Sequence, residues 1–218
     1  MNFLRGKAVV AIDEGAGRGR RGRILEVVSR VLTEQKGDAI EMQAVVKDRA
    51  LPLREGIADF PDLNELVVAM ACQQAARVTE PLRSAMQSGV FDDVRSKLIE
   101  FGTGLRAAHS SLLIGLLRKA MTDGSRCKEI RRRIYEEGPA AITAALCDYL
   151  DAAARKGNLA FANSVYATES LMGMLRAPLY GEISLHSQES TLYGSAEKAV
   201  EQAVDIFLRG CNTQETAA

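Results

Sequence analysis

The chain has 218 residues, of which 47% are hydrophobic and 26% are charged, and its 28 basic and 28 acidic side chains give a net charge of zero. This length can bury a core in one or two domains, and the composition is typical of a soluble helical protein. No uninterrupted apolar run approaches the roughly 18 residues of a membrane span, which excludes a membrane-spanning helix as the main structural element.

The N-terminal residues and the cysteine spacing indicate the cellular compartment and argue against a metal site or disulfides. Asp13 and Glu14 follow a short apolar patch where a signal peptide would continue, so we expect a cytoplasmic protein. The cysteines are widely spaced and contain no C-x-x-C pair, which favours buried or half-buried thiols over a zinc site or a disulfide framework. They are Cys72, Cys127, Cys147 and Cys211.

Residues 24–70 carry the pattern of a helix-turn-helix unit. The first predicted helix has apolar residues at helical spacing and ends at Gly37; they are Ile24, Leu25, Val27, Val28, Val31 and Leu32. Two short apolar sets follow, at 40–46 and 51–60, and helices of this length need each other and the first helix to bury a face. Asp62, with Glu65 three residues on, can cap a fourth helix that starts near Leu63.

The layout of ILEVVSRVLTEQKGDAIEMQAVVKDRALPLREGIADFPDLNEL resembles the DNA-binding head of TetR-type bacterial regulators. Three later strings look like the regulatory domain of the AefR-like branch of that family: IRRRIYEEGPAAITAALCDYLDAAARKGNL, LMGMLRAPLY and AVEQAVDIFLRGC. Together the matches cover roughly residues 20–211. The resemblance implies an all-α fold of about nine helices, with a three-helix head and a C-terminal ligand-binding and dimerisation domain.

The domain organisation follows from these segments. We expect a flexible basic arm at 1–23, a helix-turn-helix DNA-binding domain at 24–70, a regulatory ligand-binding and dimerisation domain at 71–211, and a disordered tail at 212–218. Beyond residue 70 the helical period predicts helices near 63–87, 91–106, 108–122, 126–156, 162–179 and 190–210. Pro81 and Pro139 should kink or divide two of them, and Pro139, after Gly138, is the stronger break.

The arm is basic but the head is not. Residues 1–23 hold six basic side chains against Asp13 and Glu14, a net of +4, so the arm can follow phosphates or enter a minor groove; a solvated tail is the alternative. Residues 41–62 carry a net charge of −2, and TetR-like phosphate contacts are replaced by Pro52, Ile57 and Leu63. The arm and the resemblance together imply DNA contacts at Arg18, Arg20, Arg21, Arg23, Gln43, Lys47, Arg49, Arg54 and Glu55.

The regulatory half suggests two surfaces. In TetR-like proteins the last two helices form a four-helix dimer interface, and small and apolar residues here suit one, with packing inside one chain as the alternative. The interface candidates are Leu171, Leu175, Leu179, Ala196, Ala199, Val200, Ala203, Val204 and Phe207. By position, an apolar ligand pocket would use Phe101, Leu105, His109, Leu113, Tyr149, Met172 and Met174, although each also suits an ordinary core.

Other functions fit less well. Gly17, Gly19 and Gly22 satisfy G-x-G-x-x-G, but arginines interrupt the loop and no second strand follows, which argues against a dinucleotide cofactor. His109 and His186 lack catalytic partners in the sequence, and S-x-x-K at 125–128 lies in a turn, so we expect no enzyme, metal or cofactor.

We therefore predict a homodimeric, ligand-responsive transcriptional regulator. As a repressor it would bind double-stranded DNA at a near-palindromic operator, and the family implies that a small hydrophobic or aromatic effector releases it. The alternative is a small-molecule-binding dimer of the same fold whose acidic head binds DNA weakly or not at all.

Overall fold

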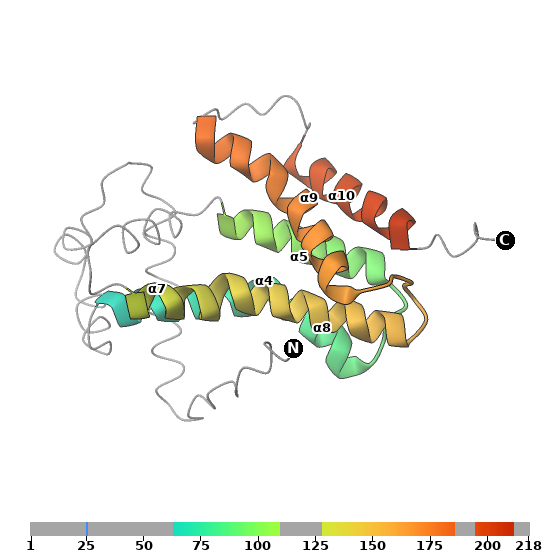
Figure 1. Ribbon diagram of the computed structural model, residues 1–218, viewed down its shortest axis with the longest axis horizontal. Coiled ribbons are helices and arrows are strands. Elements are labelled where there is room, and N and C mark those ends of the chain that lie inside the picture. Colours follow the sequence, from blue (N-terminus) through green and yellow to red (C-terminus); the bar gives the residue numbers. More distant parts are fainter. Residues whose placement is uncertain (1–24, 26–62, 110–127, 186–194, 212–218) are drawn as a thin grey trace. The chain divides into compact units, whose positions relative to one another are not determined.

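The computed structural model describes Leu25 and residues 63–109, 128–185 and 195–211, and every element in these ranges is helical (Figure 1). The chain divides into two compact units, Met1–Leu66 and Val67–Ala218. Leu25 is helical and buried, and the rest of the predicted arm, helix-turn-helix and tail lies outside the described residues. So does most of the helix expected at 108–122.

The second unit is built from helices that Figure 1 labels in chain order. Helix α4 spans Leu63–Ser88 and begins in the first unit, and α5 spans Val94–His109. A continuous helical run follows: α7 at Lys128–Tyr135, the π-helix η2 at Glu136–Ala140 and α8 at Ala141–Arg155 (Figure 1). The last two helices are α9 at Ser164–Leu185 and α10 at Ala196–Cys211. None of the described helices has both the length and the hydropathy of a membrane span.

Helix α4 begins at Leu63 as the Asp62 pattern predicted, whereas α5 differs from its predicted limits. The Asp93 carboxylate accepts a hydrogen bond from the Ser96 N–H at 2.9 Å, which fixes the start of α5 three residues later than expected. Gly102 and Gly104 both lie inside α5, within the helix predicted at 91–106.

The two prolines do not break their helices. Helix α4 continues through Pro81. At Pro139 the prediction of a break was wrong, because the chain stays helical and changes to a π-turn instead. The flanking residues Tyr135 and Ala141 keep right-handed helical φ values of −65° and −63°. A π-turn absorbs the missing proline N–H without ending the helix.

One main core joins five helices. Buried apolar side chains from α4, α5, α8, α9 and α10 form a single cluster, and α10 packs on α5 and α9 while α9 packs on α8. Hydrogen bonds from the loop after α8 to Phe91 and to the end of α10 also stabilise this core. The Asn158 amide donates to the Phe91 carbonyl oxygen at 3.1 Å, and the Ala160 N–H donates to the Cys211 carbonyl oxygen at 3.0 Å. An exposed ion pair between Arg95 and Asp205, at 2.7 Å, links α5 to α10.

The close packing of α5 on α9 and α10 depends on Gly102. A Cβ at this position would lie 2.7 Å from Cγ1 of Val200 and 3.0 Å from Cδ2 of Leu175. Both neighbours are buried, so neither can turn away into solvent. Glycine is therefore required here by the approach of two other helices.

We expect Gly102→Ala to lower the free energy of unfolding by roughly 1 to 3 kcal/mol, because the added methyl group overpacks the core. Gly104 of the same helix is the matched control, since a Cβ there would lie 3.7 Å from the Val78 Cα, an ordinary contact distance. Gly104→Ala should raise stability by up to about 1 kcal/mol through helix propensity. Urea denaturation of the two variants checks this, and a Gly102→Ala protein as stable as the wild type would contradict the assignment.

Candidate effector site and dimer face

Tyr149 is the largest side chain that the main core buries completely. The buried face of α8 consists of Ile142, Leu146, Tyr149, Leu150 and Ala153, which recur at helical spacing. The Tyr149 ring packs on the Phe91 ring with 5.5 Å between centroids and 32° between the ring planes. The aromatic ring is thus well packed, but the hydroxyl group of the same side chain lies in an apolar environment.

The hydroxyl of Tyr149 has no hydrogen-bond partner among the described residues. Burial, with the nearby carboxylates of Asp93 and Glu100 adding to it, raises the pKa of Tyr149 to about 12. The group therefore stays protonated at neutral pH and can donate as well as accept a hydrogen bond. An unsatisfied hydroxyl in a core costs about 1 to 3 kcal/mol, so its presence requires an explanation.

Thr168 of α9 presents a second hydroxyl of the same kind. Thr79 and Thr168 are the two buried polar side chains within the described residues. The Thr79 hydroxyl is satisfied within its own helix, because it donates a hydrogen bond to the Ala75 carbonyl oxygen at 2.8 Å. Thr168 makes no such bond, and its Oγ1 has no partner in the described part of the chain. Helix α9, which carries Thr168, packs against α8, which carries Tyr149.

The opposite face of α9 is exposed and partly apolar. Val165, Tyr166, Ser170 and Gly173 are all exposed and share one side of the helix, and Tyr166 has 75% of its surface exposed. The Ser170 hydroxyl donates to the Tyr166 carbonyl oxygen at 2.8 Å, which satisfies that hydroxyl. The charged Glu169 is also exposed on this face. On α10, Ile206 is 60% exposed. Helices α9 and α10 pack together, and large exposed apolar side chains are typical of a protein interface.

Residues 96–210 match the family model of the AefR-like transcriptional repressor C-terminal domain, and this match covers more than half of the chain. The chain belongs to the TetR family of transcriptional regulators. No curated protein is significantly similar to it.

Solved structures of TetR-family regulators share the fold. A protein of Mesorhizobium loti described as a TetR-family transcriptional regulator aligns with a TM-score of 0.63 and 17% identity, over 90% of this chain and 98% of that chain. The TetR-family regulator PfmR of Thermus thermophilus aligns with a TM-score of 0.57 and 16% identity, over 86% and 97% of the two chains. The flavonoid-responsive regulator FrrA aligns with a TM-score of 0.53 and 20% identity, over 91% and 100%.

Most of the predicted pocket residues of this TetR-family regulator lie in one core. Phe101, Leu105, Tyr149 and Met172 are buried members of it, and Met174 is half-buried against it. His109 is the last residue of α5, and its side chain is outside the described set, as is all of Leu113. Thr168 was not among the residues predicted from the sequence. Its position beside Ala167 and three residues before Leu171, on a buried face, was the available signal.

The predicted interface residues are placed differently from the exposed face. Leu171, Leu175, Val200, Ala203, Val204 and Phe207 are all buried in the core of the one chain, and Ala199 is half-buried. Leu179 and Ala196 lie in α9 and α10, with side chains outside the described set. Contact of any of these residues with a second chain stays a prediction. The sequence pattern did not indicate Tyr166 or Ile206, because single exposed apolar residues are common on helices.

The predicted DNA contacts all lie outside the described residues and stay predictions. They are Arg18, Arg20, Arg21, Arg23, Gln43, Lys47, Arg49, Arg54 and Glu55.

Proposed function

We propose that this TetR-family regulator is a homodimeric repressor that binds a near-palindromic operator and is released by a small, mainly apolar effector. The observation that carries the proposal is the match of residues 96–210 to the C-terminal domain of AefR-like repressors. Two copies of a helix-turn-helix head are needed because each reads one half-site of a palindrome.

DNA binding would combine the head with the basic arm. Lys47, Arg49 and Arg54 are the cations of the predicted helix-turn-helix, and Gln43 and Glu55 can form hydrogen bonds with base edges. The arginines at 18, 20, 21 and 23 add phosphate contacts, which raise affinity without reading sequence.

The effector would bind in the core around Tyr149 and Thr168. Phe101, Leu105 and Met172 supply apolar surface, and the two unsatisfied hydroxyls supply the polar contacts that orient a ligand. An apolar molecule with at least one hydrogen-bonding oxygen fits this chemistry. FrrA, which shares the fold, is described as flavonoid-responsive, so flavonoids and simple phenols are the first compounds to test.

Release of DNA would follow from the tight packing of that core. The side chains around Tyr149 are buried, so a ligand must displace some of them and shift the helices that carry them. An effector that binds the shifted arrangement more tightly moves the population toward it, and the spacing of the two heads then no longer matches the operator.

The dimer would form through the exposed face of α9 and α10 that carries Val165, Tyr166, Ser170, Gly173 and Ile206. The leucines at 171 and 175 support this face from within their own chain, because their side chains are already buried there. The small residues Ser170 and Gly173 permit close approach of a partner helix, and Tyr166 is large enough to anchor it.

A second candidate function is a ligand-binding dimer of the same fold with a weakened head. The net charge of −2 over residues 41–62 favours it, because an acidic surface is repelled by phosphates. The basic arm argues for retained DNA binding.

Selection from a pool of random duplexes distinguishes the two functions. We expect the purified full chain to enrich a near-palindrome and to bind it as a dimer. A variant with Arg18, Arg20, Arg21 and Arg23 changed to alanine should bind all duplexes more weakly and with a smaller salt dependence, since fewer counterions are released. Enrichment of no sequence, or sequence-blind binding that disappears with the arm, would establish the weakened head and reject the repressor.

The dimer face is tested by Tyr166→Lys. Because Tyr166 is 75% exposed in one chain, the variant should fold normally but weaken dimerisation by about 2 to 4 kcal/mol, measured by sedimentation equilibrium. Val90→Lys is the matched control, since Val90 is also an exposed apolar residue but lies in the turn before α5. Equal dimerisation of the Tyr166→Lys variant and the wild type would reject this face.

A further inference from the structure

The buried hydroxyl of Tyr149 lies near the first turns of α5. The Tyr149 ring packs on Phe91, which comes two residues before Asp93 in the chain. The carboxylates of Asp93 and Glu100 both act on the hydroxyl, since each adds to the effect of burial in raising the pKa of Tyr149. A ligand group that reaches this hydroxyl therefore enters the field of two carboxylates.

Both carboxylates already have partners on α5. The Asp93 carboxylate accepts the Ser96 N–H, and the Lys97 Nζ lies 3.0 Å from both carboxylate oxygens of Glu100. The two carboxylates and the one ammonium group leave this part of α5 with an excess of negative charge. Lys97 is held by Glu100, so a ligand carboxylate would have to compete with Glu100 for it.

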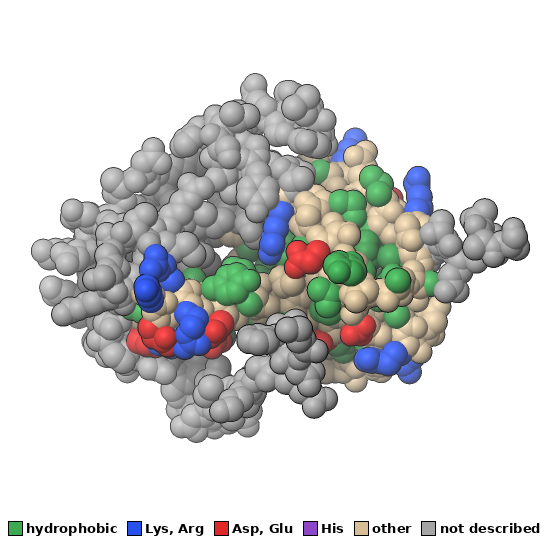
Figure 2. All heavy atoms as spheres, viewed as in Figure 1, with side chains coloured by type: hydrophobic (Ala, Val, Ile, Leu, Met, Phe, Trp, Pro, Cys, Tyr) green, Lys and Arg blue, Asp and Glu red, His purple; other side chains and the backbone are tan. Residues whose placement is uncertain are grey.

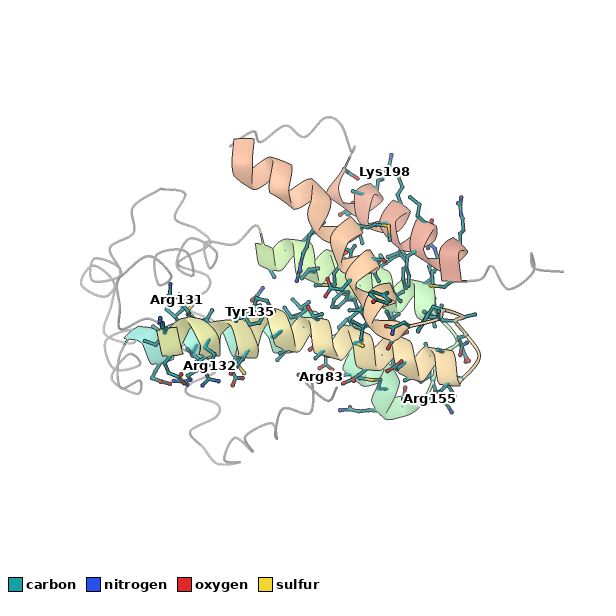
Figure 3. All side chains as sticks on the ribbon, viewed as in Figure 1. Arg83, Arg131, Arg132, Tyr135, Arg155 and Lys198 are labelled. Atoms are coloured by element: carbon teal, nitrogen blue, oxygen red, sulfur yellow. The ribbon has the colours of Figure 1, made fainter. Side chains whose placement is uncertain are left out.

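The other cations that the structure describes lie at the surface or on other sides of the helices. Within the described ranges, the fully buried residues include no charged side chain. Arg83, Arg155 and Lys198 are exposed (Figure 3), and basic side chains stand at separate places on the surface in Figure 2. Arg95 pairs with Asp205 of α10.

Arg106 has two buried guanidinium nitrogens, Nε and Nη1, but it lies on a different side of α5. It follows Gly102 by one helical turn, and Gly102 packs on α9 and α10. Glu100 precedes Gly104 by one turn, and a Cβ on Gly104 would contact α4. Arg106 therefore does not offset the negative charge on the side of α5 that carries Glu100.

We propose that the effector group bonded to Tyr149 is an uncharged oxygen acceptor, such as a carbonyl or ether oxygen, and that carboxylates are excluded from this position. The proposal rests on the proposed effector site. The Tyr149 hydroxyl keeps its proton at neutral pH, so it can donate a hydrogen bond to such an oxygen. A carboxylate at the same place would lose its hydration and be repelled by Asp93 and Glu100.

Calorimetric titration of the full-length protein without DNA, using isosteric pairs of compounds, tests the proposal. The probes are benzoate against benzamide and naphthoate against naphthamide, since each carboxamide has the shape of its acid but no charge. We expect the carboxamide of at least one pair to bind with a Kd on the order of tenfold or more below that of its acid. A carboxylate that binds as tightly as its carboxamide would overturn the proposal.

Two variants locate the preference at Tyr149. Tyr149→Phe should weaken carboxamide binding by about fivefold or more, because the hydrogen-bond donor is lost. Asp93→Asn keeps a residue that can cap α5 but removes its charge, so it should strengthen binding of the acid by about threefold and leave the carboxamide unchanged. Asp92→Asn is the matched control, because it removes the same charge from the neighbouring exposed residue, and its effect should be smaller. Equal effects of Asp92→Asn and Asp93→Asn on the acid would reject a local cause.

The outcomes separate this proposal from the proposed function. The titration contains no DNA, so failed operator selection would leave the charge preference standing. If acids and carboxamides bind equally well and both lose affinity in Tyr149→Phe, the effector site is present and the charge preference is wrong. If no compound of either kind binds, the charge preference falls together with the effector site.

Discussion

The regulatory domain depends on how closely α5 can approach α9 and α10. Gly102 makes that approach possible, because its missing side chain leaves room for Val200 and Leu175. The five-helix core then closes around side chains from every helix that meets there, and the exposed face of α9 is presented to solvent. A core packed this tightly responds to a bound molecule by moving whole helices, which is the property that a ligand-responsive regulator needs.

Two hydroxyl groups add unsatisfied hydrogen-bonding capacity to this otherwise apolar core. Tyr149 and Thr168 are buried without a partner in the described residues, whereas Thr79 shows that a buried threonine can satisfy itself on its own helix. Stability alone would favour phenylalanine and valine at the two positions, since each unsatisfied hydroxyl carries a cost. Unsatisfied polar groups of this kind are characteristic of binding sites, where a ligand completes the hydrogen bonds.

The sequence predicted local features better than contacts between helices. The start of α4 followed from a capping residue and apolar spacing, and the family followed from motifs such as Glu-Gly-Pro. The role of Gly102 could not be predicted, because the sequence does not reveal which helices cross there. Pro139 was predicted to break its helix, because the sequence does not show whether a helix ends at a proline or continues through a π-turn. A stripe such as Leu171 and Leu175 has the same spacing whether it packs inside one chain or between two.

Release of the selected operator by a phenolic compound tests the central claim most directly. Fluorescence anisotropy with a panel of flavonoids and simple phenols should find a compound that raises the operator Kd of the wild type at least about tenfold. Tyr149→Phe and Thr168→Val should keep operator affinity and lose that response, whereas Ser170→Ala, which removes an exposed and satisfied hydroxyl from the same helix, should respond normally. A Thr168→Val or Tyr149→Phe protein that responds like the wild type would contradict the account.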